Sequence, residues 1–455
     1  MIHSTDTIVA LSTPPGIGAI GIIRISGDKA ISISDQVFSK DLLKAEGYSL
    51  HYGSILKGEE VLDEVVLSVF RKPRSFTKED VVEISCHGST YILQEVIQLL
   101  IEKGARPALA GEFTQRAYLN GAMDLAQAEA VADLIASSSA ASHKMALRQM
   151  RGGISNELQA LRVELLNFTS LIELELDFSE EDVEFADRQQ LEELIERIQQ
   201  KLESLVSSFR LGNAIKQGVP TVIMGKPNAG KSTLLNTLLN ENRAIVSDIP
   251  GTTRDVIEDR VIIEGIEFRL MDTAGVRETQ DVIEAEGVRR TLSLAEQANL
   301  LIYIYDLSTD SLSEAEAYLA GLNLAEGSQI MILANKEDLL DAKPDLSSSS
   351  YPTLTFSAKE KTQIDQLKQM MLTAVQNFST VSPDQTLISN SRHLHALQKA
   401  LTAIQDVQAG LLNGLTGDLL SIDIRTVLHH IGEITGEITN DEVLGNIFSK
   451  FCIGK

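Results

Sequence analysis

The chain has 455 residues, with 40 Lys and Arg against 64 Asp and Glu, which gives a formal net charge of −24. This length predicts about three domains of roughly 150 residues each, and the acidic balance argues against a protein that binds nucleic acid mainly by neutralising phosphates. Because the sequence has only two cysteines, no signal or transit pattern at its start and no apolar run near the roughly 20 residues of a membrane span, we expect a cytoplasmic protein with no membrane segment.

Residues 1–118 predict an α+β domain. Short β-rich segments broken by Gly, Pro and charged residues are expected as strands at 7–11, 19–26, 61–70 and 80–87. A helix is expected at 89–103, with apolar residues at helical spacing and Gly104 at its end. The strands and helices do not alternate regularly, which favours α+β over a parallel α/β sheet.

Residues 119–217 predict helices at 122–139, 141–177 and 188–209, because apolar residues recur every three to four positions. The stretch 173–187 holds eight acids and no base, which we interpret as a solvated turn that breaks the helical pattern.

Residues 218–378 alternate between strands and helices, which is typical of an α/β nucleotide-binding domain. Strands are expected at 221–224, 261–263, 268–272, 300–306, 330–334 and 353–356, with a helix at 232–240 and a serine-rich surface loop at 347–350. Helical spacing returns at 391–412, 419–433 and 441–448. We therefore expect the α/β domain to be inserted into a helical domain formed by 119–217 and 379–455.

Residues 225–232, GKPNAGKS, fit the phosphate-loop pattern G-x-x-x-x-G-K-[ST] between a predicted strand and a predicted helix. The glycines let backbone N–H groups approach the phosphates at the positive end of the helix. Lys231 is predicted to bind the β- and γ-phosphates, and the Ser232 hydroxyl to bind Mg²⁺. A chance glycine-rich turn is the alternative, and the flanking strand and helix argue against it.

Two further segments extend this predicted site. Asp272, at the end of an apolar strand, is predicted to hold Mg²⁺ through water, and the Gly275 N–H to contact the γ-phosphate. Thr253, in the polar segment 251–255, is predicted to complete the Mg²⁺ coordination when the γ-phosphate is present.

Guanine specificity is predicted from residues 335–338, NKED, after an apolar strand. The Asp338 carboxylate can accept both the ring N1–H and the exocyclic amine of guanine, whereas adenine would leave it unpaired at a cost of about 1–3 kcal/mol. Residues 357–359, SAK, fit a loop that supports the base. The motifs in this order resemble the GTPases related to translation factors. The predicted nucleotide contacts are Asn228, Ala229, Gly230, Lys231, Ser232, Thr233, Ser247, Asp248, Ile249, Pro250, Gly251, Thr252, Thr253, Asp272, Thr273, Ala274, Gly275, Asn335, Lys336, Asp338, Ser357, Ala358 and Lys359.

Val276 stands where Ras-like GTPases carry a water-orienting glutamine. Either the chain is a slow GTP-binding switch, or other groups compensate. Asn228 could help to ligate a monovalent cation that stabilises charge in the transition state, and Glu284 could position the attacking water. The catalytic candidates are therefore Glu284, Asn228 and Lys231. Three neighbours of Glu284 are equally acidic, namely Glu278, Asp281 and Glu286.

A second pattern of short segments extends along the rest of the chain. It consists of 20–27 IGIIRISG, 75–80 SFTKED, 86–88 CHG, 111–117 GEFTQRA, 119–121 LNG, 124–130 DLAQAEA and 451–455 FCIGK. Together with the GTPase motifs, these segments resemble the MnmE (TrmE) family of tRNA modification GTPases from end to end, whereas other GTPases share only the middle third. The resemblance implies an N-terminal α+β folate-binding and dimerisation domain (1–118) and a helical domain (119–217 and 379–455) interrupted by a Ras-like α/β G domain (218–378).

The resemblance also implies a homodimer that assembles into a heterotetramer with the flavin-dependent protein MnmG (GidA), with FAD held only by that partner. The complex would modify carbon 5 of the wobble uridine of certain tRNAs with an aminomethyl or carboxymethylaminomethyl group. The one-carbon unit would come from 5-formyl-tetrahydrofolate or a related folate. The G domains would meet when GTP and K⁺ are bound, and GTP hydrolysis would drive the conformational cycle.

The same resemblance assigns ligands for the two cations. The K⁺ ligands would be Asn228 and the backbone of the loop that follows, through Ser247, Ile249 and Thr252, and the Mg²⁺ ligands would be Ser232 and Thr253. Glu284 matches the family's catalytic glutamate, and Val276 matches an apolar residue of the family.

The residues that match the family's folate ligands are Arg24, Glu83, Ala122 and Lys455. Glu83 would accept the adjacent N–H and amine donors of a pterin, and the anionic glutamate tail suits Arg24 or Lys455. Without the resemblance, Arg24 and Lys455 would be interpreted as surface ion pairs and Glu83 as a strand-face charge. The family usually has a basic residue where Ala122 stands, so that contact is either lost or replaced in this chain.

Cys452 lies in the matched C-terminal segment, beside the expected folate site. It is either a small buried hydrophobic residue or a chemical group of that site. Cys86 and His87 are interpreted as packing and turn residues, because two possible ligands do not make a metal cage.

Two other classes of GTPase are alternatives. A ribosome-assembly GTPase would need an RNA-binding module or a basic patch, and the net charge of −24 counts against it. A membrane-remodelling GTPase would need an amphipathic or apolar tip, which the sequence does not show.

Overall fold

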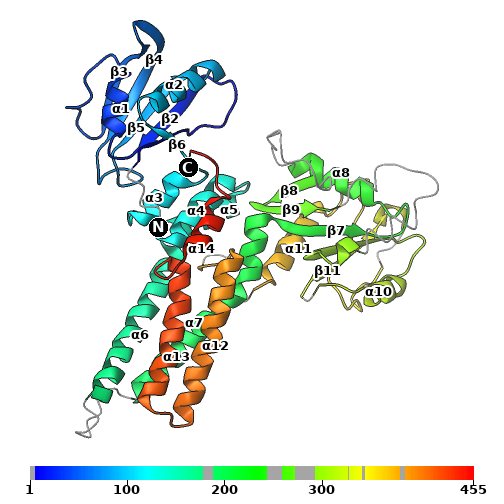
Figure 1. Cartoon of the computed structure of the whole chain (residues 1–455). Coiled ribbons are helices and arrows are strands. Elements are labelled where there is room, and N and C mark those ends of the chain that lie inside the picture. Colours follow the sequence, from blue (N-terminus) through cyan, green and yellow to red (C-terminus); the bar gives the residue numbers. More distant parts are fainter. Residues whose placement is uncertain are drawn as a thin grey trace. The chain divides into compact units, whose positions relative to one another are not determined.

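The computed structural model describes residues 6–177, 188–242, 259–271, 293–325, 327–340, 344–379 and 385–454 (Figure 1). The chain forms two compact units, and each combines one β-sheet with helical segments. The first unit consists of Met1–Ala132, Gln149–Ser155 and Gly432–Lys455, and the second of Asp133–Arg148 and Asn156–Ile431. These units do not follow the predicted boundaries at 118, 217 and 378, and the predicted division into four parts stays a prediction.

The first unit contains a six-stranded sheet in the order β3-β4-β5-β2-β1-β6. All pairs are antiparallel except β1 with β6. The strands are β1 (Ile8–Leu11), β2 (Ile20–Ser26), β3 (Ser49–Lys57), β4 (Glu60–Phe70), β5 (Val81–His87) and β6 (Arg106–Pro107). Helices α1 (Ala30–Asp35) and α2 (Thr90–Glu102) pack against one face of this sheet and form its core. Because side chains alternate along a strand, the register partners Arg24 and Glu83 lie together on the other face.

The four strands predicted in this region are confirmed, but the sequence did not predict β3. Polar residues and a central glycine interrupt its alternation. Gly53 is required at that place, because a Cβ there would lie 2.6 Å from Cζ of Phe38.

Outside the sheet, the chain also forms the helices α3 (Glu112–Leu119), α4 (Leu125–Ala136) and α14 (Asp441–Phe448). Leu125 and Ala128 of α4 pack against Leu444 and Phe448 of α14. The chain then continues to residues 452–454, where Ile453 forms a β-bridge with Ala110.

The helical part continues with α5 (Ala140–Met150) and the longer helices α6 (Gly153–Asp177), α7 (Arg188–Gln217), α12 (Ser391–Leu412) and α13 (Gly417–Thr435). Helices α7 and α12 pack side by side (Figure 1). The single helix predicted over 141–177 is wrong, because the chain breaks between α5 and α6, where Gly152 has a left-handed φ of 87°. Among the described residues, no helix has both the length and the apolar character needed to cross a membrane.

The second unit also contains a six-stranded sheet, in the order β12-β11-β10-β7-β9-β8, and all its pairs are parallel except β8 with β9. The strands are β7 (Val219–Met224), β8 (Asp259–Ile263), β9 (Ile266–Leu270), β10 (Leu300–Asp306), β11 (Gln329–Asn335) and β12 (Thr353–Thr355). Every residue of β10 is buried, as expected for a parallel strand that is covered on both faces. Helices α8 (Lys231–Asn242), α10 (Leu312–Ala320) and α11 (Ile364–Gln376) complete this predicted α/β fold.

Candidate functional site

The phosphate loop follows the carboxyl end of β7 and leads into α8. Gly225 and Gly230 have φ values of 149° and 105°. A Cβ on Gly225 would lie 2.0 Å from the Ile304 carbonyl oxygen, and one on Gly230 would lie 2.0 Å from Nδ2 of Asn335. Only glycine fits at either position, and the loop's backbone N–H groups can therefore approach an anion closely at the start of α8.

Lys231 is held by the loop to which it belongs. Its Nζ donates to the carbonyl oxygens of Gly225 at 2.8 Å and Lys226 at 2.7 Å. Burial lowers the pKa of the Lys231 ammonium. Asn228 is exposed and has a left-handed φ of 63°, a conformation that asparagine tolerates better than most residues.

Asn335 joins the phosphate loop to the predicted base loop. This side chain is buried, its Nδ2 donates to the Ala229 carbonyl at 2.7 Å, and its Oδ1 accepts from the Ala358 N–H at 3.0 Å. One amide therefore fixes the spacing between the segments predicted to hold the phosphates and the base.

Asp338 lies in the short 3-10 helix η3 (Glu337–Leu339), directly after β11. The residue is exposed, and its Oδ1 accepts from the Ser357 hydroxyl at 2.5 Å. The Ser357 N–H in turn donates to Oγ1 of Thr362 at 2.8 Å. Through these bonds, the loop at 357–359, which was predicted to support the base, orients the Asp338 carboxylate.

Lys336 is anchored by the neighbouring strand. Its ammonium forms an ion pair with Asp306 at the end of β10. Burial alone would raise the pKa of Asp306, but hydrogen bonds from Lys336 and Ser308 lower it below its ordinary value. Asp306 therefore stays charged and holds Lys336 beside Asp338.

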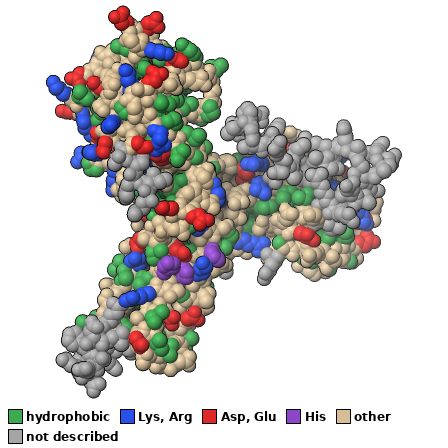
Figure 2. Space-filling view, viewed as in Figure 1, with side chains coloured by type: hydrophobic (Ala, Val, Ile, Leu, Met, Phe, Trp, Pro, Cys, Tyr) green, Lys and Arg blue, Asp and Glu red, His purple; other side chains and the backbone are tan. Residues whose placement is uncertain are grey.

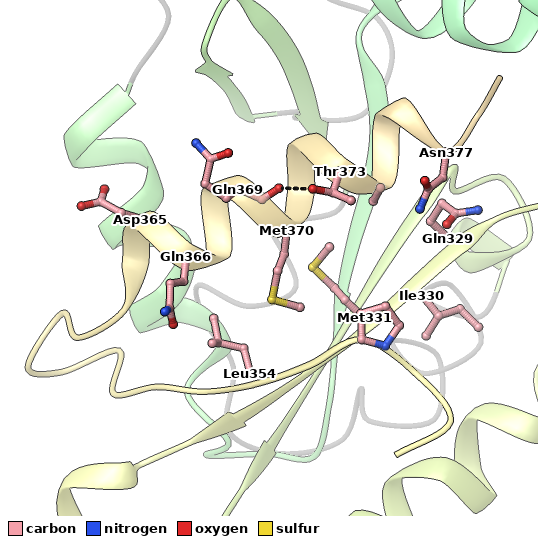
Figure 3. A pocket seen from close by; sticks show the side chains of 12 residues that line it. Gln329, Ile330, Met331, Leu354, Asp365, Gln366, Gln369, Met370, Thr373 and Asn377 are labelled. Carbon is pink, nitrogen blue, oxygen red and sulfur yellow. Dashed lines mark hydrogen bonds between the residues drawn. The ribbon is translucent and has the colours of Figure 1, made fainter. Parts of the chain in front are cut away.

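A cavity of about 510 Å³ lies elsewhere in this domain, between α11 and the strands β11 and β12 (Figure 3). Its lining includes Met331, Leu354 and Met370, and it reaches Gln329 at the start of β11. Because Asn335 is at the opposite end of β11, this cavity is separate from the nucleotide site.

Several predicted site residues lie outside the described residues. They are Ser247, Asp248, Ile249, Pro250, Gly251, Thr252, Thr253, Asp272, Thr273, Ala274, Gly275, Glu284 and Lys455, together with Val276.

The second predicted site lies on the face of the N-terminal sheet away from α1 and α2. Arg24 donates from Nε and Nη2 to Oε1 of Glu83, at 2.9 and 2.8 Å. The guanidinium carbon of Arg24 lies 5.4 Å from the ring centre of Phe76 and 5.7 Å from that of Phe113. The sequence did not predict a role for either ring, although both lie in segments that match the family.

The C-terminal segment lies beside this sheet. The Gly111 N–H donates to the Cys452 carbonyl at 3.4 Å, and the Ser12 hydroxyl donates to the Gly454 carbonyl at 3.2 Å. The thiol-bearing residue Cys452 is exposed, so its interpretation as a small buried hydrophobic residue is wrong. Cys86 is buried, and this burial raises the pKa of its thiol to about 12, which fits a packing role.

Ala122 lies in the turn after α3 and is exposed. The adjacent Gly121 carbonyl accepts a hydrogen bond from Nζ of Lys78 at 2.5 Å. The structure thus places a basic group from another loop next to the position where the family usually has one.

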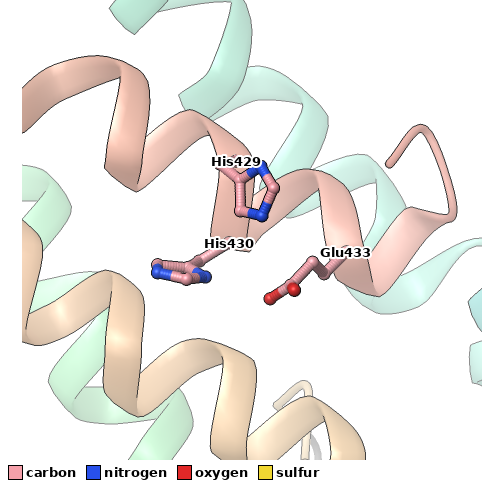
Figure 4. A group of neighbouring side chains, drawn as sticks. All are labelled: His429, His430 and Glu433. Atoms are coloured by element: carbon pink, nitrogen blue, oxygen red, sulfur yellow. The ribbon is translucent and has the colours of Figure 1, made fainter. Parts of the chain in front are cut away.

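One turn of α13 carries His429, His430 and Glu433, whose ligating atoms lie within 4.8 Å of one another (Figure 4). The sequence did not predict this group. Each of the three residues also takes part in a further interaction, and three neighbouring donors on one turn do not by themselves define a metal centre.

The carboxyl ends of β7, β10 and β11 bring the phosphate loop, Lys336 and Asp338 to one edge of a parallel sheet. That edge is where α/β folds bind nucleotides, and Asp338, the predicted acceptor for guanine, lies there with its carboxylate held by Ser357. The fold and the site therefore define a P-loop GTPase.

Comparisons with known proteins identify the family. The model described as "MnmE helical domain" matches residues 125–452, and the model described as "GTP-binding protein TrmE N-terminus" matches residues 7–122. A protein of Flavobacterium psychrophilum is 52% identical over 99% of both chains, and one of Cytophaga hutchinsonii is 54% identical over 100% of this chain and 98% of its own. A protein of Bacteroides thetaiotaomicron is 53% identical over 99% of both. All three relatives are named tRNA modification GTPase MnmE. The chain belongs to the MnmE family, as the resemblance predicted, and it is a GTP hydrolase.

Proposed function

We propose that GTP hydrolysis by this chain drives the conformational cycle of a complex that modifies carbon 5 of the wobble uridine in certain tRNAs. Family membership makes the chain a GTPase of tRNA modification. The observation that carries the proposal is the Asp338 carboxylate, held by Ser357 at the sheet edge that carries the phosphate loop, within a chain at least 52% identical to these relatives over nearly its full length. In such a protein the useful output of hydrolysis is a change of conformation.

Mass spectrometry of tRNA nucleosides tests this function. Deleting the gene should remove the 5-substituted wobble uridines, and the wild-type gene should restore them. Lys231→Ala should not restore them, because the phosphates lose their cation. Lys201→Ala serves as the matched control, since its ion pair with Glu157 joins α7 to α6 at 2.8 Å. An unchanged nucleoside profile after deletion would contradict the proposal and make ribosome assembly the next function to test.

Different residues would bind the different parts of GTP. Lys231 would exchange its two loop carbonyls for the β- and γ-phosphates, and Asp338 would bind the guanine edge. The Ser232 hydroxyl, at the start of α8, would hold Mg²⁺ together with Thr253. Mg²⁺ would neutralise charge on the phosphates when bound.

We further propose that K⁺ is a cofactor of hydrolysis, held by Asn228 with Ser247, Ile249 and Thr252. Asn228 is exposed on the phosphate loop, and its amide oxygen is the kind of hard donor that such a cation prefers. Val276 has no polar atom with which to orient water, so the reaction needs another source of stabilisation. A cation beside the phosphates would supply it electrostatically, and Glu284 would position the water.

GTP turnover should therefore be faster in KCl than in NaCl at equal ionic strength. We expect a difference of about tenfold or more, since one electrostatic group at the transition state is worth at least about 1.4 kcal/mol. Phosphate release measured in both salts gives the ratio. Asn228→Ala should abolish the preference for KCl, and equal rates for the wild-type protein would contradict the K⁺ mechanism.

A folate site is proposed on the open face of the N-terminal sheet. Glu83 would accept the adjacent donors of a pterin, and the rings of Phe76 and Phe113 offer flat apolar walls beside Arg24. The described part of the C-terminal segment reaches Gly454, whose carbonyl accepts from Ser12, and the next residue, Lys455, is proposed to bind the anionic tail. The ligand would be 5-formyl-tetrahydrofolate or a related folate.

Lys78 is proposed to replace the basic side chain that the family usually has at position 122. Lys78→Ala should weaken folate binding about tenfold, the value of one charge-assisted hydrogen bond near 1.4 kcal/mol. Titration calorimetry with 5-formyl-tetrahydrofolate measures the affinity. Lys72→Ala is the matched control, because Lys72 lies in the same loop and its exposed ammonium pairs with Asp28 at 2.9 Å. Equal affinities of the two variants would contradict the role of Lys78.

A homodimer is proposed through the N-terminal sheet. The edge strand β3 and its neighbour β4 expose Leu50, Tyr52 and Val66, with exposed fractions of 72%, 61% and 40%. Figure 2 shows hydrophobic side chains among the charged ones on this part of the chain. An exposed apolar edge of this kind favours covering by another chain.

The proposed assembly also includes the flavin-dependent partner MnmG (GidA), which would hold FAD, and tRNA. The net charge of −24 supports a complex in which the partner supplies much of the tRNA-binding surface. Such a complex would work in the cytoplasm, where tRNA is modified.

A further inference from the structure

The hairpin formed by β8 and β9 contacts the N-terminal end of α5. Glu264 and Gly265 form its turn, with φ values of 45° and 83°. The Gly265 carbonyl accepts from the Ala141 N–H at 3.1 Å. A Cβ on Gly265 would lie only 3.2 Å from Cβ of Ala140. The turn is thus fitted closely against the first residues of α5.

Glu267 on β9 makes a second contact between the hairpin and the segment that leads into α5. The residue is 3% exposed, its Oε2 accepts from the Ser138 hydroxyl at 2.5 Å, and its Oε1 lies 3.2 Å from Nη1 of Arg260. Burying a carboxylate costs several kcal/mol unless it is paired, and an apolar side chain often gives equal or higher stability at such a place. The other buried residues of this hairpin are apolar. A charged residue here therefore suggests a purpose other than stability.

The strand that carries Glu267 also contacts the turn between α7 and β7. Gly218 at this turn has a φ of 81°, and a Cβ on it would lie 3.2 Å from Oε1 of Glu267. Nη1 of Arg269 donates to the Gln217 carbonyl at 3.4 Å. Strand β9 is therefore connected to α5 and to the last residues of α7.

The hairpin lies in the chain between two segments predicted to contact the nucleotide. Strand β8 follows the segment that includes Thr253, and β9 leads toward Asp272. We propose that Glu267 is a positioning residue of the GTP-linked cycle, which transmits the nucleotide state from this hairpin to α5 through Ser138. This inference rests on the conformational cycle proposed above. A shift at either end of the hairpin would be passed to the N-terminus of α5, because the hairpin accepts hydrogen bonds from the Ala141 N–H in α5 and from Ser138, two residues before α5.

Hydrogen exchange of the full chain tests this coupling. Exchange is measured by mass spectrometry in peptides that cover α5, with GDP and with a non-hydrolysable GTP analogue. In the wild-type protein we expect rates in α5 to differ about threefold or more between the two states. Ser138→Ala and Glu267→Gln should remove most of that difference. Glu264→Gln is the matched control, because this exposed acid lies in the same turn and accepts from Gln369 at 3.0 Å, away from α5.

The exchange rates distinguish coupling to the nucleotide state from a role that only stabilises the fold. A purely structural role would raise exchange equally in both nucleotide states and leave the difference intact, which would overturn the proposal. The same result in Ser138→Ala alone would also overturn it, since that variant keeps the pair between Glu267 and Arg260. If wild-type α5 shows no difference between the states while other peptides do, the coupling to α5 is overturned; if no peptide differs, the conformational cycle itself fails. GTP turnover of Ser138→Ala should stay within about twofold of the wild-type value.

Discussion

Asp338→Asn is expected to weaken GTP binding about a hundredfold and to make the site bind xanthosine triphosphate. Guanine presents two adjacent donors, and only a carboxylate can accept both. An asparagine amide keeps one acceptor for the ring N1–H, but its NH₂ group faces the exocyclic amine of guanine. The loss of one charged hydrogen bond and the unpaired donors together cost about 2.7 kcal/mol, which corresponds to the hundredfold change.

Xanthine reverses this balance, because it has a carbonyl oxygen where guanine has the amine. The amide NH₂ can then donate to that oxygen. The substitution should leave the support of this side chain intact, since the Ser357 hydroxyl can donate to an amide oxygen as it does to the carboxylate. We therefore expect a change of specificity and a preserved fold.

Competition between the two nucleotides for the purified chain measures this effect. Glu337→Gln is the matched control, because Glu337 is the neighbouring acid and its Oε2 accepts from Nε2 of Gln363 at 3.3 Å. The control should keep its preference for GTP. Undiminished GTP affinity in Asp338→Asn would show that another group reads the base, and would leave family membership unaffected.

The elements predicted correctly are those whose sequence pattern lies within a short stretch of consecutive residues. Helices α12 and α14 and strand β10 have the predicted bounds, because helical spacing or an unbroken apolar run marks each of them. The phosphate loop was also predicted, since its pattern lies within eight consecutive residues. The resemblance to the MnmE family was likewise found from short stretches of consecutive residues.

The contacts that fix the site were not predictable, because they join distant residues. Asn335 was expected at the nucleotide, but its bond to Ala229 spans 106 positions and its bond to Ala358 spans 23. No spacing rule connects such positions. The burial of Glu267 had no clear signal, because its strand also carries the charged Arg269, and its partner Ser138 lies 129 positions away.

A network of charges around the buried residues Arg116 and Glu112 in the N-terminal unit also joins distant residues, and it has the largest expected effect on stability. Arg116 is buried, and its Nη2 contacts Asp6 at 2.7 Å and Glu112 at 3.0 Å, while its Nη1 lies 3.3 Å from Glu79. Arg106 contacts Asp6 and Glu112 as well, each at 2.6 Å. Two guanidinium groups thus contact three carboxylates that come from separate parts of the chain.

Arg116→Met should destabilise this unit by about 3–5 kcal/mol, because removing one partner of a buried charge network leaves a carboxylate uncompensated. Urea denaturation of the full chain gives the free energy of unfolding. Arg74→Met is the matched control, since Arg74 is exposed in the loop that carries Glu79. The control should change the stability by no more than about 0.5 kcal/mol.

The loss should also depend on pH. The pKa of Asp6 is lowered mainly by hydrogen bonding from Arg106, and further by Arg116. Burial alone would raise the pKa of Glu112, but hydrogen bonds from Arg106, the Leu109 N–H and Arg116 lower it. Carboxyls with a lowered folded-state pKa add stability that is fully present above their unfolded values near pH 4 and is lost as pH falls through the folded values. The difference between wild type and Arg116→Met should therefore be constant near neutral pH and shrink below about pH 4. A difference that stays the same down to that pH would mean that Arg116 stabilises the unit by packing, and that its charge contributes little.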